Sequence, residues 1–492
     1  MILSPLFLLV PILVSIAGGY GVLLFGFKNE RPREIYAEAV TCLTSVLVWI
    51  AILNVERGAE AEIYSFTRGF SMALFMDGAS MLFAGMVSLM WPMVLLYAFA
   101  YLHEARFKNA FFAFYIMTYG ITLGIAFASN MTTLYVFYEM LTLVTLPLVV
   151  YYGNAESMHA GRIYAAYTIG GASLGFFTLL MTTLYGHGGS FIYGGSLDGT
   201  GDYRMLMLAF VFGFFGYGTK AAILPLSKWL PMASVAPTPV TALLHAVAVV
   251  NSGAFAVIRM VWYVYGPEML YGTAEQHICL LTAIVTIVFS AVMALKERHF
   301  KRRLAWSTVS NLSYMLFGIL LVTPDGLRGG MAHMLFHGIV KMSLFLCAGA
   351  FMHVTGDEYI YEINGVGKKM PVTFVLYTLA ALSLTGIPLF CGFVSKWQLF
   401  TAAAEVGDGW AILGMASLIL ASLLCAMYTL MITIRAFFPM HGTDWYQDDY
   451  IYGDAGIRML GPLAFFVIAN IAFGIWPGPI LRFLTMISQG YI

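Results

Sequence analysis

Four ionisable side chains lie deep inside long apolar stretches of this sequence. Glu139 is nine residues into the run that starts at Met131, and Lys220, Lys341 and Lys396 are likewise far from the polar segments. An ionisable group at the centre of a bilayer costs at least about 2.5–3.5 kcal/mol on insertion scales, so each one needs a partner, water or a function. One acid cannot neutralise three charged lysines, so some lysines should be neutral part of the time. Such groups can bind and release protons, which is the minimum machinery of a proton relay.

Three more chemically active positions follow one another at intervals of four in the segment "AHMLFHGIVK". His333, His337 and Lys341 would form one stripe of a helix, drifting about 40° per step and covering roughly 12 Å of a path through the membrane. His245 stands in another apolar run. A single intramembrane histidine is often only a hydrogen-bonding residue, and a single lysine or glutamate can be an interhelical salt bridge. The whole set is harder to explain as packing, and it favours a relay.

Two of the lysines stand beside prolines in corresponding parts of the two halves of the chain. Lys220 is followed by Pro225, and Lys396 is preceded by Pro388 in "LSLTGIPLFCGFVSKW". Proline removes a backbone hydrogen bond and clashes with the preceding turn, so each helix should break near its lysine. Broken helices at matching positions of two halves indicate an internal repeat and are typical of transporter sites.

The elements that must position these residues are predicted to be membrane-spanning helices. Hydrophobic residues make up 60% of the 492 residues and charged residues only 10%, which is typical of integral membrane proteins. About fourteen apolar runs are long enough to cross a bilayer. They lie near 3–25, 36–54, 73–101, 111–129, 131–152, 163–186, 206–228, 236–262, 276–295, 304–322, 330–354, 371–400, 409–438 and 457–485. We expect one all-α membrane domain, with an uncleaved first run.

The formal net charge is zero, but the basic residues fall mainly in alternate loops. Sixteen lie on one side of the predicted spans, among them Lys28, Arg33, Lys108, Lys301 and Arg458, against five on the other side. By the positive-inside rule the first set is cytoplasmic, which would place both termini outside.

The sequence indicates no cofactor, metal or nucleotide site and no nucleic-acid partner. The five cysteines are scattered singly, with no C-x-x-C pair for zinc or an iron–sulfur cluster. "GFFGYGTK" resembles a phosphate-binding loop only weakly, because it runs inside an apolar helical span rather than after a strand. His333 and His337 at i and i+4 cannot be opposite axial ligands of one haem.

Several long motifs in order resemble the antiporter-like subunits of respiratory complex I, Mrp antiporters and membrane-bound hydrogenases. They are "TKAAILPLSKWLPMASVAPTPVTALLHAV", "RRLAWSTVSNLSYM", "HMLFHGIVKMSLFLCAG" and "LTGIPLFCGFVSKW", and the resemblance covers about residues 70–440. In length the chain resembles the core-length members of the family, and its segment "APTPVTALLHAVAVV" most resembles D-type Mrp and hydrogenase membrane subunits.

The resemblance implies a core of fourteen helices with two inverted five-helix repeats and broken seventh and twelfth helices. Its implied divisions are three N-terminal helices in 1–110, repeats in 111–265 and 276–440, and a last helix in 441–492. By motif, Glu139 is similar to the acid of helix five, Lys220 to the lysine of helix seven and His245 to the relay residue of helix eight. Lys341 then resembles the central lysine, and Lys396 the lysine that exchanges protons with the outer side.

The chain departs from the family pattern on the side where protons would enter. Ser227 replaces a histidine of the "P-x-H-x-W" turn, Asn251 a lysine found in some members, and His299 an acidic residue before the basic pair of its loop. Lys301, Ser227 and Asn251 are therefore the candidate inner access residues.

The resemblance implies a proton- or cation-translocating subunit of a redox-driven complex in the cell membrane. Its expected partners are homologous and small membrane subunits, a peripheral redox module, the lipid bilayer, H⁺ and, as an alternative ion, Na⁺. The oxidoreductase activity would belong to the complex, with no catalytic residue or redox centre in this chain. A Mrp-type Na⁺/H⁺ antiporter subunit without redox chemistry is the second hypothesis, and a purely structural scaffold the third.

Overall fold

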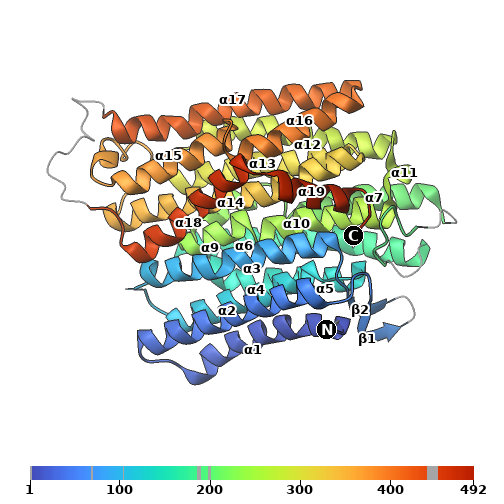
Figure 1. Cartoon of the computed structure of the whole chain (residues 1–492), viewed down its shortest axis with the longest axis horizontal. Coiled ribbons are helices and arrows are strands. Elements are labelled where there is room, and N and C mark those ends of the chain that lie inside the picture. The colour runs from blue at the N-terminus through green and yellow to red at the C-terminus, as the bar shows by residue number, and fades with distance from the viewer. Residues whose placement is uncertain (1–2, 68–69, 104, 186–189, 198–200, 440–452) are drawn as a thin grey trace.

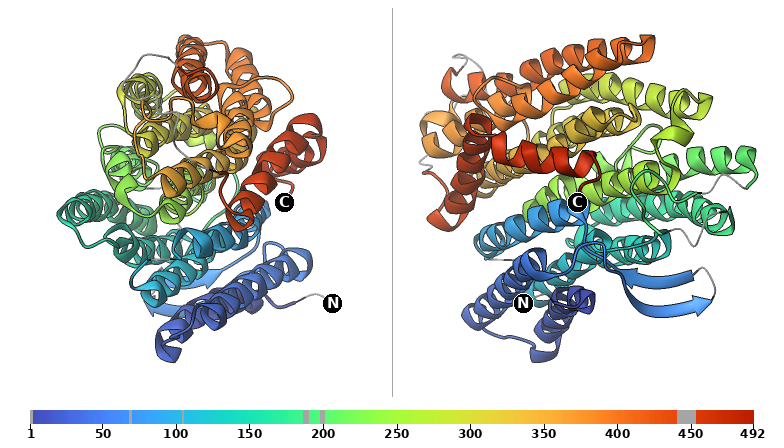
Figure 2. Two further views of the ribbon diagram at one scale, coloured as in Figure 1. Left: turned by 90° about the vertical axis from the view of Figure 1, so that its left-hand side faces the viewer. Right: turned by 45° about the vertical axis from the view of Figure 1, so that its right-hand side comes forward.

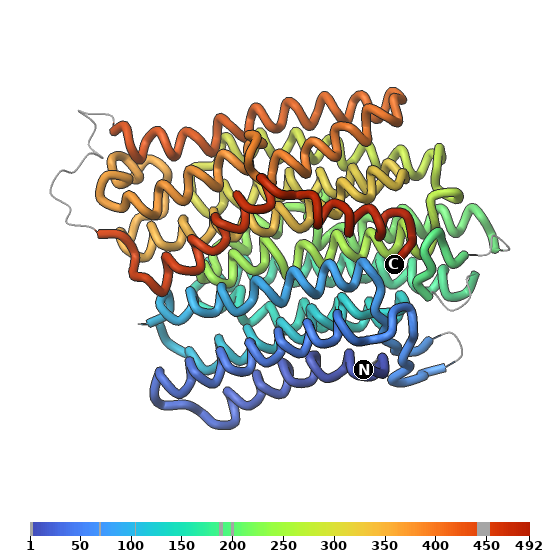
Figure 3. Tube along the Cα trace, in the orientation of Figure 1, coloured from blue at the N-terminus to red at the C-terminus, as the bar shows by residue number. Residues whose placement is uncertain are grey.

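The computed structural model is a bundle of long helices that run side by side (Figure 1). It describes residues 3–67, 70–103, 105–185, 190–197, 201–439 and 453–492. The helices follow one another across the bundle from α1 at one side to α17 at the other, and α18 and α19 lie across its face (Figures 1 and 3). Figure 2 shows the same order in a view along the helices.

The first part of the chain supplies seven long helices and one hairpin. Their bounds are η1 (Pro5–Leu8), α1 (Leu9–Phe25), α2 (Glu30–Asn54), β1 (Ala61–Thr67), β2 (Phe70–Leu74), α3 (Gly78–Tyr101), α4 (Lys108–Ala126), α5 (Met131–Val149), α6 (Ala155–Tyr185) and α7 (Tyr203–Gly218). The antiparallel β1–β2 hairpin lies in a polar segment for which the sequence predicted no strand.

The rest of the chain continues with helices, several of which are interrupted. Their bounds are α8 (Trp229–Met232), η2 (Ala233–Val235), α9 (Thr238–Ala246), α10 (Val249–Ile258), the π-helix η3 (Arg259–Tyr265), α11 (Pro267–Leu270), α12 (Ala274–Lys296), α13 (Phe300–Leu320), α14 (Pro324–Thr355), η4 (Val366–Lys368), α15 (Pro371–Thr385), α16 (Cys391–Val406), α17 (Gly409–Phe437), α18 (Ile457–Ile475) and α19 (Gly478–Ser488). The run predicted near 457–485 is thus two helices, which separate at Trp476 and Pro477.

Polar residues at the loop ends fix where the helices start. Asp77 accepts a hydrogen bond from the Ser80 backbone N–H at 2.8 Å and caps α3. Asn130 caps α5 in the same way through the Thr133 N–H at 2.8 Å. These caps satisfy backbone donors that have no partner within the helix. The apolar residues between such caps then have enough length to cross a bilayer.

Among the described residues, eleven helices are long and apolar enough to span a membrane. The most deeply buried are α14 and the continuous run Thr238–Tyr265, which form the centre of the bundle. Helix α14 packs against α3, α9, α13, α15, α16 and α18. His245, His333, His337 and Lys341 therefore lie on helices that other helices enclose.

Residues that the sequence predicts to be cytoplasmic lie at one end of the bundle, where they form ion pairs between the first turns of different helices. Lys108 pairs with Glu30, Arg302 with Glu156 at 2.5 Å, and Arg458 with Glu34 at 3.3 Å. The N and C labels both lie at the opposite end (Figure 1). This arrangement agrees with the alternation of basic loops; Arg68, one of the five basic residues of the other set, lies outside the described residues.

Candidate functional site

The helix that carries Lys220 is interrupted at the lysine, as the proline predicts. Helix α7 ends at Gly218, and regular helix resumes only at Trp229, the start of α8. Ala222 has a φ of 55°, which only a strained L-residue adopts, and the Trp229 indole N–H donates to the freed Thr219 carbonyl at 2.8 Å. The break thus leaves backbone carbonyls without helical hydrogen bonds in the interior of the protein, beside the fully buried Lys220.

Lys220 and Glu139 lie close together, but they do not form a contact ion pair. The Lys220 Nζ donates to the backbone carbonyl of Tyr138 on α5 and lies 3.4 Å from the centre of the Tyr138 ring. Glu139, the next residue, is half-buried and interacts electrostatically with Lys220. Its Oε1 is buried without a hydrogen-bond partner in the described part of the chain. An unsatisfied carboxylate oxygen next to a buried ammonium group can accept a water molecule or a proton.

A second irregularity surrounds His245. Helix α9 ends at Ala246, the Val247 backbone departs from helical geometry with φ −136° and ψ −62°, and α10 starts at Val249. The His245 Nε2 lies 3.5 Å from the Ser234 Oγ, while its Nδ1 is buried and has no partner among the described residues. The imidazole therefore keeps a free nitrogen for proton transfer.

The side chain of Asn251 stabilises the interruption between α9 and α10. Its Nδ2 donates to the Ala246 carbonyl at 2.7 Å, an oxygen released where α9 ends. Two residues later, Gly253 lies against the backbone of Lys220 and Ala221, where an added Cβ would clash with the Ala221 nitrogen. Close packing between α10 and the α7 break therefore requires glycine at this position.

The predicted stripe on α14 lies in the centre of the bundle and connects to α13 and α16. Lys341 Nζ donates to the Leu304 carbonyl at 2.9 Å and to the Ser307 hydroxyl. His333 contacts Asn311 Oδ1 through Nε2 at 3.2 Å and Ser395 Oγ through Nδ1 at 2.9 Å.

The two ends of this arrangement are joined by Asn311, whose Nδ2 donates to the Ser307 carbonyl at 2.7 Å. Lys341, Ser307, Asn311, His333 and Ser395 thus form one buried polar chain, which ends at the residue before Lys396. This chain fixes the positions of the Lys341 ammonium group and the His333 ring inside the bundle.

His337 stands between His333 and Lys341 on the stripe and forms no hydrogen bond with a described residue. Both ring nitrogens are buried and lack partners in the described residues, and its ring centroid lies 5.8 Å from that of His333. It interacts electrostatically with Lys341 and Lys396. Unsatisfied buried nitrogens in a polar region are places where ordered water is expected.

Lys396 stabilises the second interruption, which lies between α15 and α16. Helix α15 ends at Thr385, α16 starts at Cys391, and Leu389 between them has a φ of 77°. The Lys396 Nζ reaches back and donates to the carbonyls of Leu384 at 2.7 Å and Thr385 at 3.1 Å, and to Ser422 Oγ at 3.1 Å. An ammonium at the carbonyl end of α15 is favoured both by hydrogen bonding and by the helix dipole.

Of the candidate inner access residues, Lys301 is placed next to the His245 region. Its Nζ donates to the Ala236 carbonyl at 2.9 Å in the connection that also contains Ser234. Lys301 and Lys341 both interact electrostatically with His245. Ser227 is buried in the non-helical connection after Lys220. No hydrogen bond joins Lys220 directly to His245 among the described residues.

The residue pair that sequence reasoning missed is Asp77 and Arg259. An arginine near the outer end of a span can extend to the membrane surface, but Arg259 is fully buried. Its Nη1 and Nη2 contact the two Asp77 oxygens at 2.6 and 2.7 Å, and Nη2 also donates to Ser80 Oγ at 2.9 Å. Four aromatic rings surround the guanidinium, with centroids 4.4–5.2 Å away: Phe75, Phe191, Phe255 and Tyr263. The sequence signal that could have indicated this ion pair was an arginine in an otherwise apolar span.

Within the described ranges, no group of three or more His, Cys, Asp or Glu side chains is arranged to hold a metal ion. Cys42 is exposed, and Cys279, Cys347, Cys391 and Cys425 are buried as free thiols.

Comparison with known proteins places the chain in a family. The family described as "NADH:quinone oxidoreductase/Mrp antiporter, TM" matches residues 128–424, more than half of the chain. The chain belongs to this family. The match includes both interruptions and all of the candidate relay residues from Glu139 to Lys396.

Individual relatives come from both branches of the family. The chain is 32% identical over 357 residues to the A subunit of the Na(+)/H(+) antiporter of Alkalihalophilus pseudofirmus, covering 68% of this chain and 43% of that protein. It is 33% identical over 340 residues to NADH-quinone oxidoreductase subunit N of Desulforudis audaxviator, covering 68% of this chain and 66% of that protein. The chain thus spans less than two thirds of the length of either relative.

The fold is similar to that of a chain in the solved Mrp complex from Dietzia sp. DQ12-45-1b. The TM-score is 0.85 at 21% identity, covering 99% of this chain and 96% of that chain. Together with the family match and the eleven candidate spans, this fold identifies a multi-pass protein of the cell membrane.

Proposed function

We propose that this protein is a proton-translocating, antiporter-like membrane subunit of a multisubunit complex driven by a redox module on other chains. The observation that carries the proposal is the buried polar chain from Lys341 to Ser395, the residue before Lys396. Membership of the NADH:quinone oxidoreductase/Mrp antiporter family supports it.

The proposed architecture has fourteen membrane crossings. Eleven are the long apolar helices; the other three are α7 with α8, α13, and α15 with α16. Helices α7 and α15 are apolar but short, because each ends at an interruption. Helix α13 is long enough, but it carries charged and polar residues that include Ser307 and Asn311. Two inverted five-helix repeats, residues 111–265 and 276–440, would follow the N-terminal unit 1–110 and precede the C-terminal unit 441–492. The two interruptions, each with a strained non-glycine residue, support this division.

In the proposed mechanism, a charge change on a neighbouring chain of the complex alters the interaction between Glu139 and Lys220. Since Lys220 is held by a carbonyl and an aromatic ring rather than by the carboxylate, its proton can leave when the local charge changes. His245 would receive the proton, and Lys341 would pass it on. The proton would then pass from Lys341 through water beside His337 to His333, which Asn311 orients, and on to Lys396, which releases it at the outer side.

The step from Lys220 to His245 requires water or a side-chain movement. Gly253 keeps the α7 break and α10 in contact at this point. The free Nδ1 of His245 and the unsatisfied Oε1 of Glu139 are the groups that bound water would join.

A Mrp-type Na⁺/H⁺ antiporter subunit without redox chemistry is the second candidate. The antiporter relative from Alkalihalophilus pseudofirmus favours it, whereas the relative named NADH-quinone oxidoreductase subunit N favours redox coupling. Mass spectrometry of co-purifying proteins separates the two. Homologous and small membrane proteins without other partners indicate the Mrp type, and an added peripheral redox module indicates redox coupling.

The central experiment measures coupled proton pumping by the whole complex in proteoliposomes. Lys220→Ala and Glu139→Ala should leave assembly intact and abolish pumping, because each removes one member of the first charge pair. Lys228→Ala is the matched control, since this exposed lysine lies on the same connection. Normal pumping by both relay variants would refute the relay. Normal function of Lys220→Met, Lys341→Met and Lys396→Met would support a structural scaffold instead.

A further inference from the structure

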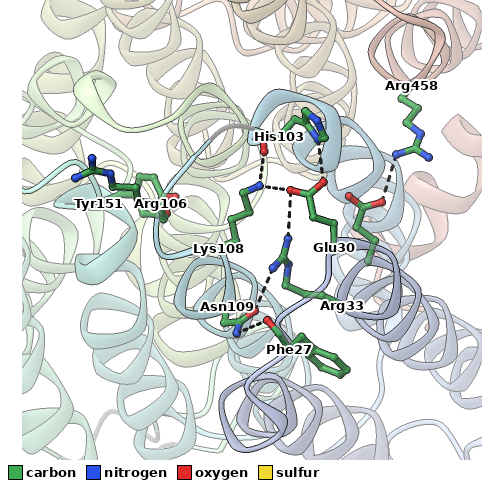
Figure 4. Close-up of polar contacts among 10 residues, drawn as sticks. Phe27, Glu30, Arg33, His103, Arg106, Lys108, Asn109, Tyr151 and Arg458 are labelled. Carbon is green, nitrogen blue, oxygen red and sulfur yellow. Dashed lines mark hydrogen bonds and ion pairs between the residues drawn. The ribbon is translucent and has the colours of Figure 1, made fainter.

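A basic pocket of about 560 Å³ lies at the cytoplasmic end of the bundle, away from the relay. Its lining comes from the end of α1, the start of α2 and the start of α4. Figure 4 shows four of the lining residues, Glu30, Arg33, Lys108 and Asn109. The residues that line it are Leu23, Lys28, Glu30, Arg33, Phe107, Lys108, Asn109 and Ala110. Neither the proposed mechanism nor the family match, which starts at residue 128, uses it.

The charges of this pocket do not balance. It contains three cations, Lys28, Arg33 and Lys108, and one acid, Glu30. Glu30 already binds the Lys108 Nζ, accepts from His103 Nδ1 at 2.9 Å and lies 3.9 Å from an Arg33 nitrogen (Figure 4). Three positive charges minus one negative charge leave an excess of two among the residues that line the pocket. The exposed Lys28 forms no ion pair with a described residue.

Arg33 is the observation that points to a missing ligand. Its side chain is 6% exposed, and its Nε is buried without a hydrogen-bond partner among the described residues. Its Nη1 reaches Asn109 Oδ1 only at 3.4 Å. A buried guanidinium normally places its planar fork of donors on carboxylate or phosphate oxygens, and this one lacks a full set of acceptors.

The start of α4 adds an independent preference for an anion. This helix has 19 residues, its N-cap Phe107 provides no side-chain cap, and its first turn contains no acid. Its first backbone N–H groups and its dipole therefore favour a negative group in the pocket. The competing negative end of α1 is partly shielded, because Asn109 Nδ2 donates to the Phe27 carbonyl at 3.0 Å.

The apolar lining identifies the kind of anion. Leu23 and Phe107 line the pocket, and Phe107 is 76% exposed. Leu24 and Phe25 at the end of α1 are exposed as well. A site with cations at its centre and exposed apolar residues beside it, at the cytoplasmic boundary of the membrane, matches an amphiphile rather than a free ion.

We propose that this pocket binds the phosphate group of an anionic phospholipid from the cytoplasmic leaflet. Lys28, Arg33 and the start of α4 hold the phosphate, and Leu23 and Phe107 contact the acyl chains. The bound lipid joins α1, α2 and α4, and so fixes the N-terminal helices against the first repeat.

The test uses the purified full chain, within any complex with which it purifies, in zwitterionic detergent. Binding of dioctanoyl phosphatidylglycerol, dioctanoyl phosphatidylcholine and inorganic phosphate is measured by native mass spectrometry and thermal shift. Saturable binding of phosphatidylglycerol, roughly tenfold or more tighter than that of phosphatidylcholine, is expected for a site with two excess charges.

Lys28→Glu should weaken phosphatidylglycerol binding by roughly tenfold or more, because an exposed cation is reversed without loss of packing. Lys296→Glu, at an exposed lysine of the same membrane side, is the control and should retain the affinity. Three results would overturn the proposal: equal binding of both lipids, equal loss in both variants, or inorganic phosphate that displaces phosphatidylglycerol with the same affinity.

Discussion

The buried pair Asp77–Arg259 allows a quantitative test of how the central helices are held. Arg259 is fully enclosed, contacts both Asp77 oxygens and joins η3 to the start of α3. Removing one partner of a buried pair costs about 3–5 kcal/mol, because the remaining charge stays buried and uncompensated. Asp77→Asn leaves a capping side chain on α3, so its cost reports the lost charge rather than the lost cap.

We expect Asp77→Asn to lower the free energy of unfolding by about 3–5 kcal/mol. Arg259→Met should cost toward the lower end of that range, because Asp77 keeps the Ser80 N–H and is 8% exposed. The double variant removes both charges and should cost no more than either single change, which implies a coupling energy of at least about 3 kcal/mol. An ordinary interhelical hydrogen bond in a membrane protein contributes only about 0.6 kcal/mol.

The measurement is a reversible SDS titration of the purified chain in mixed micelles, followed by circular dichroism and analysed as a double-mutant cycle. Arg328→Met is the control, because the Arg328–Asp325 pair is partly exposed and should contribute at most about 1 kcal/mol. Additive single effects, within about 0.5 kcal/mol, would refute the reasoning that this pair is a buried and mutually compensated unit.

Three further outcomes are expected. Lys396→Met should destabilise the chain by about 1–3 kcal/mol, because the carbonyl of the buried Leu384 loses its donor, whereas Lys396→Arg should restore part of this stability in the same titration. His333→Ala should cost more stability than His337→Ala, since only His333 has hydrogen-bond partners; equal costs would contradict the polar chain. The hydrogen bond from His299, assisted by nearby positive charges, lowers the pKa of Glu358 below its usual 4.5 despite partial burial. A lowered acid pKa stabilises the fold above about pH 4.5, and this contribution is lost as pH falls through the folded-state pKa, so the cost of Glu358→Gln in thermal unfolding should disappear in acid.

The sequence alone determined the features that depend on local chemistry. The lysine-plus-proline pattern predicted the interruption after Gly218, and the spacing of four placed His333, His337 and Lys341 on one buried stripe. Membrane helices can be predicted from sequence because the bilayer requires each helix to be apolar and to pair its own backbone hydrogen-bond donors and acceptors. Charges and prolines inside such runs then stand out.

The tertiary structure decided which groups meet. Asn251 was a candidate access residue by motif, and the packed helices show its partner, the Ala246 carbonyl at the end of α9. Lys396 lies within α16 but binds the end of α15, and Lys220 contacts Tyr138 rather than Glu139.

Arg259 shows the physical reason most clearly. Its partner Asp77 is 182 residues away, and the sequence around either residue does not indicate which residue it contacts. A segment in a membrane forms a helix because its backbone N–H and C=O groups must bond to one another within the segment. The partner of each buried charge depends instead on how the helices pack. The sequence therefore determined which residues needed partners, and only the packed bundle determined what those partners are.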